Sequence, residues 1–298
     1  MELRVLRYFL VVVREESITK AAEVLHITQP TLSRQLKELE EDVGVTLFER
    51  GTRKITLTNE GVLLRRRAED IVALVDKTSQ ELLEQDEEVS GEIFVGWGEV
   101  EAVHQMAELF KAFKKKYPLV KFSTYAANAT AVTYKLDKGL LDVGLLLEPV
   151  SIDKYEYIRL NVKEHWMAII KANDPLAKKK FITPKDLIGR NLILPMRSET
   201  TGEVRAWLGD MINKVTTDIK SSFSTNTTIM VEHGLGIGIS IEGSLPYLDT
   251  KKVCCRRLKP ALTATNVLAW RRQQPTSLAV QKFIEFAKCF LSMESHKN

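Results

Sequence analysis

The sequence Thr-Gln-Pro-Thr-Leu-Ser-Arg-Gln-Leu-Lys-Glu-Leu, residues 28–39, predicts a helix with one buried face and one polar face. Thr28 can accept hydrogen bonds from unpaired N–H groups of the first turn, and Pro30 falls where a missing N–H is not needed. Leucines recur at helical spacing and form the stripe expected to face a core: Leu32, Leu36 and Leu39. The opposite face carries Gln29, Ser33, Arg34 and Lys37.

A shorter helix should precede this one. Ser17 can cap it, and the adjacent Ala21 and Ala22 let another helix cross closely because neither has a bulky side chain. The corner His26-Ile27 leads into the polar helix. This arrangement is typical of a helix-turn-helix, whose second helix fits the DNA major groove, where arginine pairs with guanine and glutamine with adenine. The simpler alternative is an ordinary helical corner with a solvated face.

The segment Phe48–Thr58 favours the DNA-binding alternative because its pattern predicts a small hairpin. Gly51 permits the turn, and Ile55 and Leu57 alternate with polar neighbours as in a strand. The basic residues at its tip are Arg50, Arg53 and Lys54. Such a tip can enter a narrow A·T-rich minor groove, which attracts arginine. We therefore expect a wing beside the helix-turn-helix.

These residues resemble the N-terminal domain of LysR-type transcriptional regulators. The resemblance covers roughly the first sixty residues closely, through Ala21-Ala22, Ile27–Glu40, Gly44-Val45, Leu47–Arg50, Leu57-Thr58 and Gly61. It implies that the major groove is contacted by Gln29, Pro30, Ser33 and Arg34, and the minor groove by Arg53. It also implies phosphate or rim contacts from Thr28, Thr31, Lys37 and Arg50. The rest of the chain is similar to the family in length and layout.

A long helix should follow, from the capping residue Thr58 to about Glu88. Its apolar positions form a narrow seam: Leu64, Ala68, Ile71, Val75, Thr78 and Leu82. So long a helix with so thin a stripe needs a partner in water, and a second copy of itself is the simplest one. A dimer would present two recognition helices to a two-fold-related operator. The alternative is that this helix docks on the chain's own C-terminal domain.

From Glu92 onward, predicted strands alternate with predicted helices, which argues for a parallel α/β architecture. Strands are expected at 93–97, 120–126, 141–147, 166–171, 192–194, 219–223 and 267–271. Helices are expected at 102–117, 130–138, 184–188, 202–214, 227–233 and 277–291. The chain should cross between two lobes near Asn161-Val162 and again near Leu262–Asn266. Two lobes with two crossings resemble the periplasmic-binding-protein fold of LysR-type effector domains.

The predicted organisation thus has three parts. Residues 1–58 form an all-α winged helix-turn-helix domain, and residues 59–90 form a linker and dimerisation helix. Residues 91–298 form a C-terminal α/β two-lobed, periplasmic-binding-protein-like effector domain. Within it, lobe I comprises about 91–161 and 267–298, and lobe II comprises about 162–266.

Ligands of such domains bind beyond the carboxyl ends of strands, near helix N-termini. Loops in these positions supply the candidate effector-binding residues Gly98, Glu99, Asn128, Thr130, Arg197, Ser198, Thr225 and Asn226. For the threonines among them, the alternative is simple helix capping. The first loop departs from the family, because many members place Ser or Thr where this chain has Glu99 and Glu101. If either faces the cleft, a simple anion is disfavoured and a cationic or mixed-charge ligand is expected. If both face water, the loop does not constrain the ligand.

Composition narrows the class of protein. The 44% hydrophobic and 28% charged content is ordinary for a soluble globular protein, no apolar run approaches the length of a membrane span, and the N-terminus lacks a signal-peptide layout. We therefore expect a cytoplasmic protein without a membrane partner. Residues 1–67 hold 12 Lys/Arg against 10 Asp/Glu, and residues 68–90 hold 1 against 8. DNA binding must therefore depend on where a few cations stand.

The cysteines Cys254, Cys255 and Cys289 do not form a disulfide framework. The adjacent pair could be a redox sensor, although alternate positions on a strand are the simpler interpretation. The scattered His104, His165 and His233 lack paired carboxylates, so we expect no catalytic residues, no metal and no cofactor.

The expected function is sequence-specific transcriptional regulation of the LysR type, controlled by a small-molecule effector bound between the two lobes. The expected partners are double-stranded promoter or operator DNA, that effector, further copies of the chain in a dimer or a dimer of dimers, and RNA polymerase. The alternative is an enzyme or a solute-binding protein built on the two-lobed domain with an accessory DNA-binding module.

Overall fold

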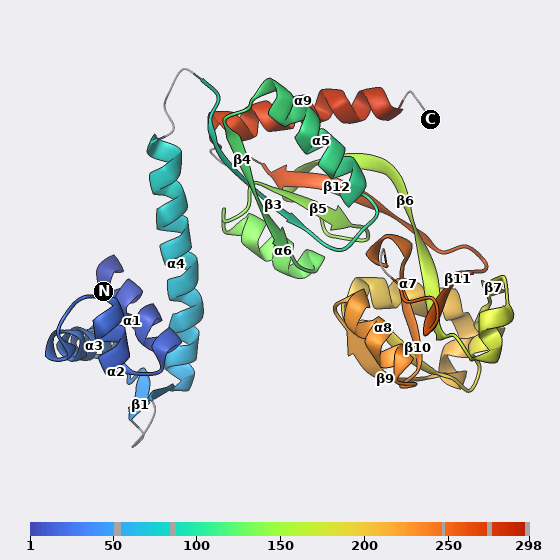
Figure 1. The fold of residues 1–298 in the computed structure, drawn as a ribbon, viewed down its shortest axis with the longest axis horizontal. Coiled ribbons are helices and arrows are strands. Elements are labelled where there is room, and N and C mark those ends of the chain that lie inside the picture. Colours follow the sequence, from blue (N-terminus) through green and yellow to red (C-terminus); the bar gives the residue numbers. More distant parts are fainter. Residues whose placement is uncertain (51–54, 84–87, 246–247, 273–275, 296–298) are drawn as a thin grey trace. The chain divides into compact units, whose positions relative to one another are not determined.

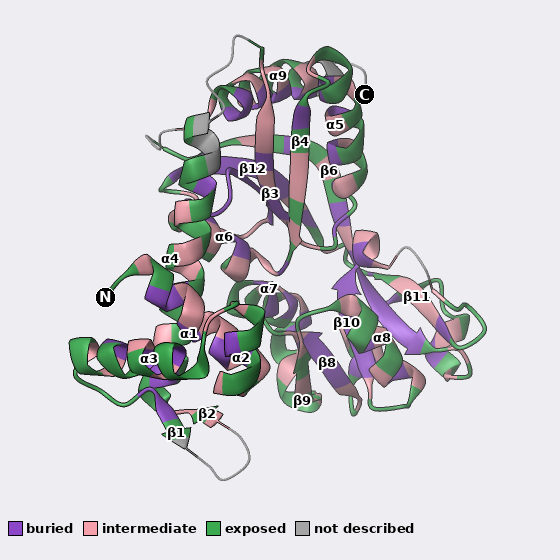
Figure 2. Cartoon of the chain, turned by 60° about the vertical axis from the view of Figure 1, so that its left-hand side comes forward, coloured by how far each residue is buried: buried purple, intermediate pink, exposed green. Residues whose placement is uncertain are grey.

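The computed structural model describes residues 1–50, 55–83, 88–245, 248–272 and 276–295. The chain divides into two compact units, Met1–Gln85 and Asp86–Asn298 (Figure 1). Figure 2 shows that buried residues concentrate on the strands and on the inward faces of the helices in each unit. The finer division into three parts, at residues 58 and 90, stays a prediction.

The first unit is a helical domain with a two-stranded wing. Its elements are α1 (Leu3–Glu15), α2 (Ile18–Val24), α3 (Gln29–Val43), β1 (Phe48–Arg50), β2 (Ile55–Leu57) and α4 (Asn59–Leu83). Ser17 caps α2 by accepting a hydrogen bond from the Lys20 N–H, and Ala21 and Ala22 are buried where the helices cross. One apolar cluster joins α1, α2, α3, the wing and the start of α4. The predicted winged helix-turn-helix is confirmed.

Helix α4 follows the wing as predicted, but its apolar seam contacts a different partner from the one expected. Thr58 caps it as expected, accepting a hydrogen bond from the Gly61 N–H at 2.9 Å. Its described part is Asn59–Leu83, residues 84–87 lie outside the described residues, and Glu88, near the expected end, lies in a bend. Leu64 and Ala68 pack into the core of the same unit. Helix α1 therefore already covers part of the apolar seam that the sequence predicts on α4.

The second unit is a two-lobed α/β domain. Its main elements are β3 (Gly91–Trp97), α5 (Val103–Lys116), β4 (Val120–Ala126), α6 (Ala129–Asp137), β5 (Val143–Leu147), β6 (Tyr155–Lys171), β7 (Phe181–Ile182), β8 (Asn191–Pro195), α7 (Ser198–Leu208), β9 (Thr216–Ser221), α8 (Ser224–Glu232), β10 (Ile237–Ile241), β11 (Val253–Leu258), β12 (Thr263–Arg271) and α9 (Leu278–Ser295). Short 3₁₀ helices occur at Pro175–Lys178, Pro184–Leu187, Gly209–Lys214 and Glu242–Ser244. The two-lobed α/β class is confirmed.

The sheet is mixed, so the parallel architecture expected from the sequence is only partly right. In lobe I the strand order is β4-β3-β5-β12-β6, and in lobe II it is β6-β10-β8-β9. Strands β3, β4 and β5 run parallel, as do β8, β9 and β10. Strand β12 pairs antiparallel with β5 and β6, and β6 pairs antiparallel with β10. The antiparallel strands are those that carry the chain across the hinge and back.

The 17-residue strand β6 carries the chain from lobe I into lobe II, as Figure 1 shows. Its first part, Tyr155–His165, pairs with β12 of lobe I, and its second part, Trp166–Lys171, pairs with β10 and β11 of lobe II. Residues Trp166 to Ile170 are buried, as expected for a strand covered on both faces. The predicted crossing near Asn161-Val162 is thus the interior of one continuous strand. The predicted short strand at 166–171 is its second half.

Candidate functional site

The first turn of α3 is built as the sequence predicts. Thr28 Oγ1 accepts a hydrogen bond from the Thr31 N–H at 3.4 Å, and the two hydroxyl oxygens lie 2.8 Å apart. Pro30 occupies the first turn. The buried leucines are Leu32, Leu36 and Leu39. Their burial fixes the rotation of α3 and turns its other face to solvent.

That solvent face carries the residues predicted to contact DNA. Thr28, Gln29, Pro30, Thr31, Arg34 and Lys37 are exposed, and Ser33 is half-buried. Arg34 Nε lies 3.8 Å from Glu38 Oε1, with the Arg34 side chain 71% exposed. Such surface pairs contribute little to stability, so the guanidinium can turn toward DNA at small cost. No carboxylate occurs in α3 before Glu38. The exposed face of the N-terminal half of the helix therefore carries side chains that can donate hydrogen bonds.

The wing is held against α3 by a contact that sequence reasoning missed. Glu40 Oε1 accepts hydrogen bonds from the Leu47 and Phe48 N–H groups at 2.7 and 3.2 Å. Strands β1 and β2 pair antiparallel. The side chain of Arg50 and the whole of Arg53 lie outside the described residues, so the DNA contacts assigned to them stay predictions.

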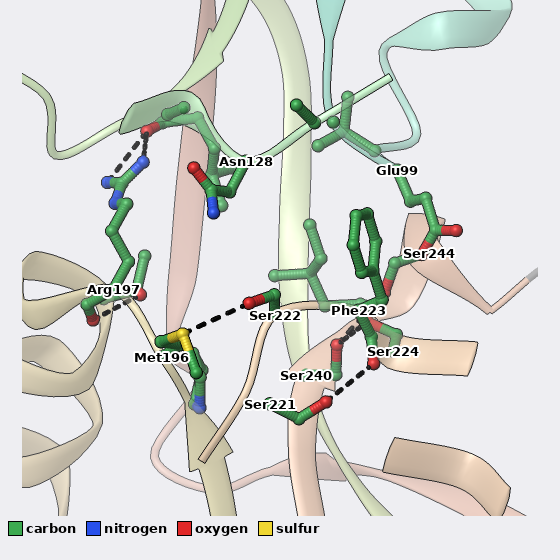
Figure 3. Close-up of a pocket in the computed structure, with 18 of the residues that line it drawn as sticks. Glu99, Asn128, Met196, Arg197, Ser221, Ser222, Phe223, Ser224, Ser240 and Ser244 are labelled. Atoms are coloured by element: carbon green, nitrogen blue, oxygen red, sulfur yellow. Dashed lines mark hydrogen bonds between the residues drawn. The ribbon is translucent and has the colours of Figure 1, made fainter. Parts of the chain in front are cut away.

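A cavity of about 130 Å³ lies between the two lobes of the second unit (Figure 3). It is lined by the carboxyl ends of β3, β4 and β5 from lobe I and of β8, β9 and β10 from lobe II, together with the starts of α6, α7 and α8. Ligands of α/β domains bind at such strand ends. We take this cavity as the candidate effector site.

Four of the eight candidate effector-binding residues line this cavity: Gly98, Glu99, Asn128 and Arg197. Thr225 lies at its edge, where its hydroxyl donates to Glu99 Oε1 at 3.5 Å. Thr130, Ser198 and Asn226 are not among the lining residues. The Ser198 hydroxyl donates instead to Glu199 at 3.0 Å. Contact of any of these residues with an effector stays a prediction.

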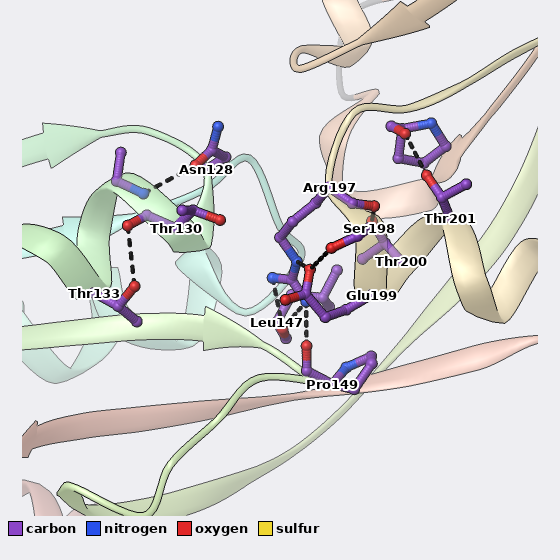
Figure 4. A network of polar contacts seen from close by, with 12 residues as sticks. Asn128, Thr130, Thr133, Leu147, Pro149, Arg197, Ser198, Glu199, Thr200 and Thr201 are labelled. Carbon is purple, nitrogen blue, oxygen red and sulfur yellow. Dashed lines mark hydrogen bonds and ion pairs between the residues drawn. The ribbon is translucent and has the colours of Figure 1, made fainter.

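Arg197 does not present its guanidinium to the cavity as a free cation. Its Nη1 and Nη2 each donate to the Leu147 carbonyl at 3.2 Å, and Nη2 also donates to the Pro149 carbonyl (Figure 4). Its Nε lies 3.6 Å from a Glu199 carboxylate oxygen, and its side chain is only 11% exposed. Burial lowers the pKa of the guanidinium, while Glu199 and Glu203 oppose that shift. Arg197 therefore ties α7 of lobe II to the end of β5 in lobe I.

The eight candidate residues do not include the serines that form one wall. Ser224, Ser240 and Ser244 make a closed set of hydroxyl contacts, with 2.7 Å from Ser244 to Ser224 and 3.1 Å from Ser240 to Ser244. Ser221 and Ser222 line the cavity beside them. The predicted strand at 219–223 is shifted, because β9 ends at Ser221. The rule that ligands bind after strand ends would have found Ser221 and Ser222 with the correct strand end, but Ser240 and Ser244 carry no local signal.

The two carboxylates of the first loop have different surroundings. Glu99 lines the cavity, whereas Glu101 does not. The backbone of Glu101 instead packs against Gly243 of lobe II, where an added Cβ would lie 2.0 Å from the Glu101 nitrogen. Glu99 is therefore the carboxylate that a bound molecule would meet.

A buried carboxylate is hydrogen-bonded to the end of the loop that carries Glu99 and Glu101. Glu164, on β6, is fully buried, and its Oε1 accepts hydrogen bonds from the Asn266 side-chain amide at 2.7 Å and the Ala102 N–H at 3.3 Å. Burial raises the pKa of Glu164, although the hydrogen bonds oppose that shift and nearby Glu101 adds to it. The contact joins both crossing strands to the start of α5.

Two features of the described residues bear on metal and redox chemistry. No group of three His, Cys, Asp or Glu side chains there could hold a metal ion. Cys254 and Cys255 lie on β11 and pack against different apolar clusters, which confirms their alternate positions on a strand. Burial raises the pKa of both thiols, and that of Cys255 to about 12, which favours the thiol over the nucleophilic thiolate. Among the described helices, none is long and apolar enough to cross a membrane.

Two family models match the chain. Residues 3–62 match the model described as bacterial regulatory helix-turn-helix protein, lysR family. Residues 86–292 match the model described as LysR substrate binding domain.

Similar proteins extend over nearly the whole chain. The HTH-type transcriptional regulator YtlI of Bacillus subtilis (strain 168) is 31% identical over 263 residues, which cover 85% of this chain and 82% of that protein. The crystal structure of CbnR, a LysR family transcriptional regulator, has a TM-score of 0.76 at 19% identity and covers 98% of this chain and 99% of that chain. The crystal structure of full-length CbnR complexed with its target DNA has a TM-score of 0.73 at 20% identity. It covers 97% of this chain and 100% of that chain. At these identities the two structures show a shared fold.

Proposed function

The chain belongs to the LysR family of transcriptional regulators, and from this premise we propose which surfaces carry its function. It is a DNA-binding transcriptional regulator with a substrate-binding domain, and this family is not an enzyme class. We propose that the exposed face of α3 contacts operator bases and that the cavity between the lobes binds the controlling small molecule.

One observation carries the DNA-binding proposal. The N-terminal half of α3 is exposed, free of carboxylates and rotated by a buried leucine stripe so that Gln29, Ser33 and Arg34 share one face. Arginine and glutamine side chains on such a face can each make two hydrogen bonds to a base edge. Thr28, Thr31 and Lys37, at the start and rim of this face, would contact phosphates. Arg50 and Arg53 are proposed to act from the wing.

We further propose that the chain acts as a dimer or a dimer of dimers. Helix α4 leaves large apolar side chains exposed within its own unit, including Ile71, Leu74 and Leu82. A second copy would cover them. Two copies would place two recognition helices on a two-fold-related site. An effector that closes the lobes would then change the relative positions of the two half-sites. Contact with RNA polymerase would convert that change into a change in the rate of transcription.

The test is DNA binding by the full-length protein. A labelled duplex from the region upstream of its own gene should be protected from nuclease cleavage in two half-sites related by symmetry. In fluorescence anisotropy the same duplex should bind at least a thousandfold more tightly than a scrambled duplex at physiological salt, the usual lower limit of specific recognition. Equal affinity for the two duplexes would contradict the proposal.

A further inference from the structure

We infer that the cavity between the lobes takes a small zwitterion, namely an amino acid with an aliphatic side chain. This inference rests on the proposed function, since it specifies the ligand class of the same cavity. The proposed ligand differs from a simple carboxylate because the groups that line the cavity call for a positive charge as well as a negative one.

The cavity has opposite charges at its two ends. Among its described lining residues, Glu99 and Arg197 are the charged ones. Figure 3 shows Glu99 beside Phe223 on one side and Arg197 beside Met196 on the other. Arg197 is already committed to two backbone carbonyls and paired with Glu199, whereas the exposed Glu99 carboxylate accepts, within the described chain, only the long contact from Thr225. The carboxylate is therefore the charged group that remains available, and an ammonium group can replace its hydrating water with a charge-assisted hydrogen bond.

The cavity wall also carries hydrogen-bond donors that lack a described acceptor. Trp166 lines the cavity at 1% exposure, and its Nε1–H has no partner within the described chain. The Arg197 Nε–H is likewise buried and makes no hydrogen bond to a described residue. Asn128 uses its Oδ1 to accept from the Ala131 N–H at 3.0 Å, which leaves its Nδ2 as a donor, and Figure 3 shows this amide directed into the cavity.

The Ser222 hydroxyl adds a further donor, since it contacts only the weakly accepting Met196 sulfur, at 3.3 Å. Two of these donors, on Trp166 and Arg197, are buried, Asn128 is half-buried and Ser222 is exposed, and donors without a strong described acceptor favour a ligand that brings a carboxylate. A cation alone would leave them unpaired, and an anion alone would meet Glu99 without a neutralising group. A molecule carrying both charges satisfies both ends.

Size and apolar surface define the rest of the molecule. A buried water occupies about 10–15 Å³ of such a cavity, so a volume of about 130 Å³ holds roughly ten non-hydrogen atoms. The apolar lining comprises Val100, Leu145, Leu147, Met196, Phe223 and Ile241. These walls fit a branched aliphatic side chain, as in leucine.

The first experiment compares three molecules that share one carbon skeleton. Isothermal titration of the full-length protein would use leucine, isocaproate, which lacks the amino group, and isopentylamine, which lacks the carboxylate. Valine, isoleucine and methionine extend the amino-acid set. We expect at least one amino acid to bind about tenfold more tightly than its deaminated and decarboxylated counterparts. Isocaproate binding as tightly as leucine, or no binding by any amino acid of the set, would overturn the inference.

The second experiment uses matched variants. Glu99→Gln should weaken amino-acid binding about tenfold and leave isocaproate binding unchanged or tighter, because the ammonium loses its charged partner. Glu101→Gln removes a carboxylate two residues away that does not line the cavity, and it should change neither affinity. Asn128→Asp keeps the cap of α6 but replaces the donor by a negative charge, so it should weaken isocaproate binding more than amino-acid binding. Amino-acid binding that is unaffected by Glu99→Gln would contradict the assignment.

Operator binding separates this inference from the proposed function. If leucine binds in a Glu99-dependent manner but leaves operator affinity and the protected half-sites unchanged, the ligand class stands and the regulatory coupling fails. If isocaproate alone changes operator binding, the coupling stands and the ligand class fails.

Discussion

Arg34 is the first cation of α3 and the residue on which base recognition most depends. Its replacement by alanine should weaken operator binding by ~1–3 kcal/mol while affinity for a scrambled duplex changes less, because a bidentate contact to one base edge is lost. Anisotropy titrations of both duplexes at one salt concentration measure this difference.

A matched control for Arg34→Ala is Arg65→Ala. Arg65 on α4 also pairs with a carboxylate one turn later, Glu69, at 2.9 Å, so both variants remove a similar surface ion pair. Arg65→Ala should leave the ratio of specific to nonspecific affinity unchanged. An unchanged ratio in Arg34→Ala would remove that residue from the proposed recognition face.

Glu164 gives the stability of the effector domain a defined dependence on pH. Its native pKa is raised above the ordinary value of 4.5, so the native state binds its proton more tightly than the unfolded state does. The contribution of Glu164 to the free energy of unfolding is therefore largest at low pH and falls as pH rises from about 4.5 through the native pKa. Glu164→Gln does not titrate and retains an oxygen acceptor for Asn266 and Ala102. The melting temperature of Glu164→Gln minus that of the wild type should therefore increase as pH rises from 4 to 7.

The control for this behaviour is Glu164→Leu, which removes the acceptor altogether. It leaves the Asn266 amide and the Ala102 N–H unpaired and should cost ~1–3 kcal/mol across the whole pH range. In a domain of this size, 1 kcal/mol corresponds to roughly 2–4 °C in melting temperature, which calorimetry resolves. A melting-temperature difference between wild type and Glu164→Gln that does not change with pH would contradict the argument.

At the scale of secondary-structure elements, the contact between the short helix Glu242–Ser244 and the loop before α5 should set how closely the lobes approach. A Cβ at Gly243 would lie 2.0 Å from the Glu101 nitrogen, and backbone cannot yield as a flexible side chain does. Gly243→Ala should therefore separate the lobes locally and cost about 1–3 kcal/mol, as overpacking does. Hydrogen exchange of the first turn of α5 should become faster in the variant.

Gly202 provides the matched control for Gly243. It lies within α7, is exposed, and an added Cβ would have no atom within 4 Å. Gly202→Ala should stabilise the domain by about 0.5–1 kcal/mol, since alanine loses less conformational freedom in a helix. Equal effects of the two substitutions on the melting temperature would show that Gly243 does not form a close interlobe contact.

At the scale of the whole molecule, the exposed apolar side chains of α4 should hold two copies together. Leu74 and Leu82 are 42% and 65% exposed in the single chain. Changing both to glutamate should shift the protein from dimer to monomer in light scattering. Operator affinity should fall by about a hundredfold, because two linked recognition helices bind far more tightly than one.

Leu119, which is 52% exposed in the turn before β4, is the control site for this pair. Leu119→Glu adds the same charge to an exposed leucine outside α4 and should leave the molar mass unchanged. A double variant at Leu74 and Leu82 that remains dimeric would place the interface elsewhere.

The helix-turn-helix could be predicted from the sequence because its determinants are local. The caps Ser17, Thr28 and Thr58 each bond to an N–H three residues later, and the leucine stripe of α3 follows from helical spacing. Such interactions involve few residues and are visible in a short window of sequence. The two-lobed α/β class could be predicted for a similar reason, since strands and helices alternate along the chain.

The lining and charge of the cavity could be decided only by the tertiary structure. Glu99 was placed there by the rule for strand ends, but Trp166 on β6, Ser240 on β10 and Ser244 in the following 3₁₀ helix meet it only after folding. Arg197 was expected to bind an effector, yet the approach of two backbone carbonyls from lobe I occupies its guanidinium. A residue's type and spacing specify what it can bind, whereas the groups already within hydrogen-bond distance determine what it has left to offer.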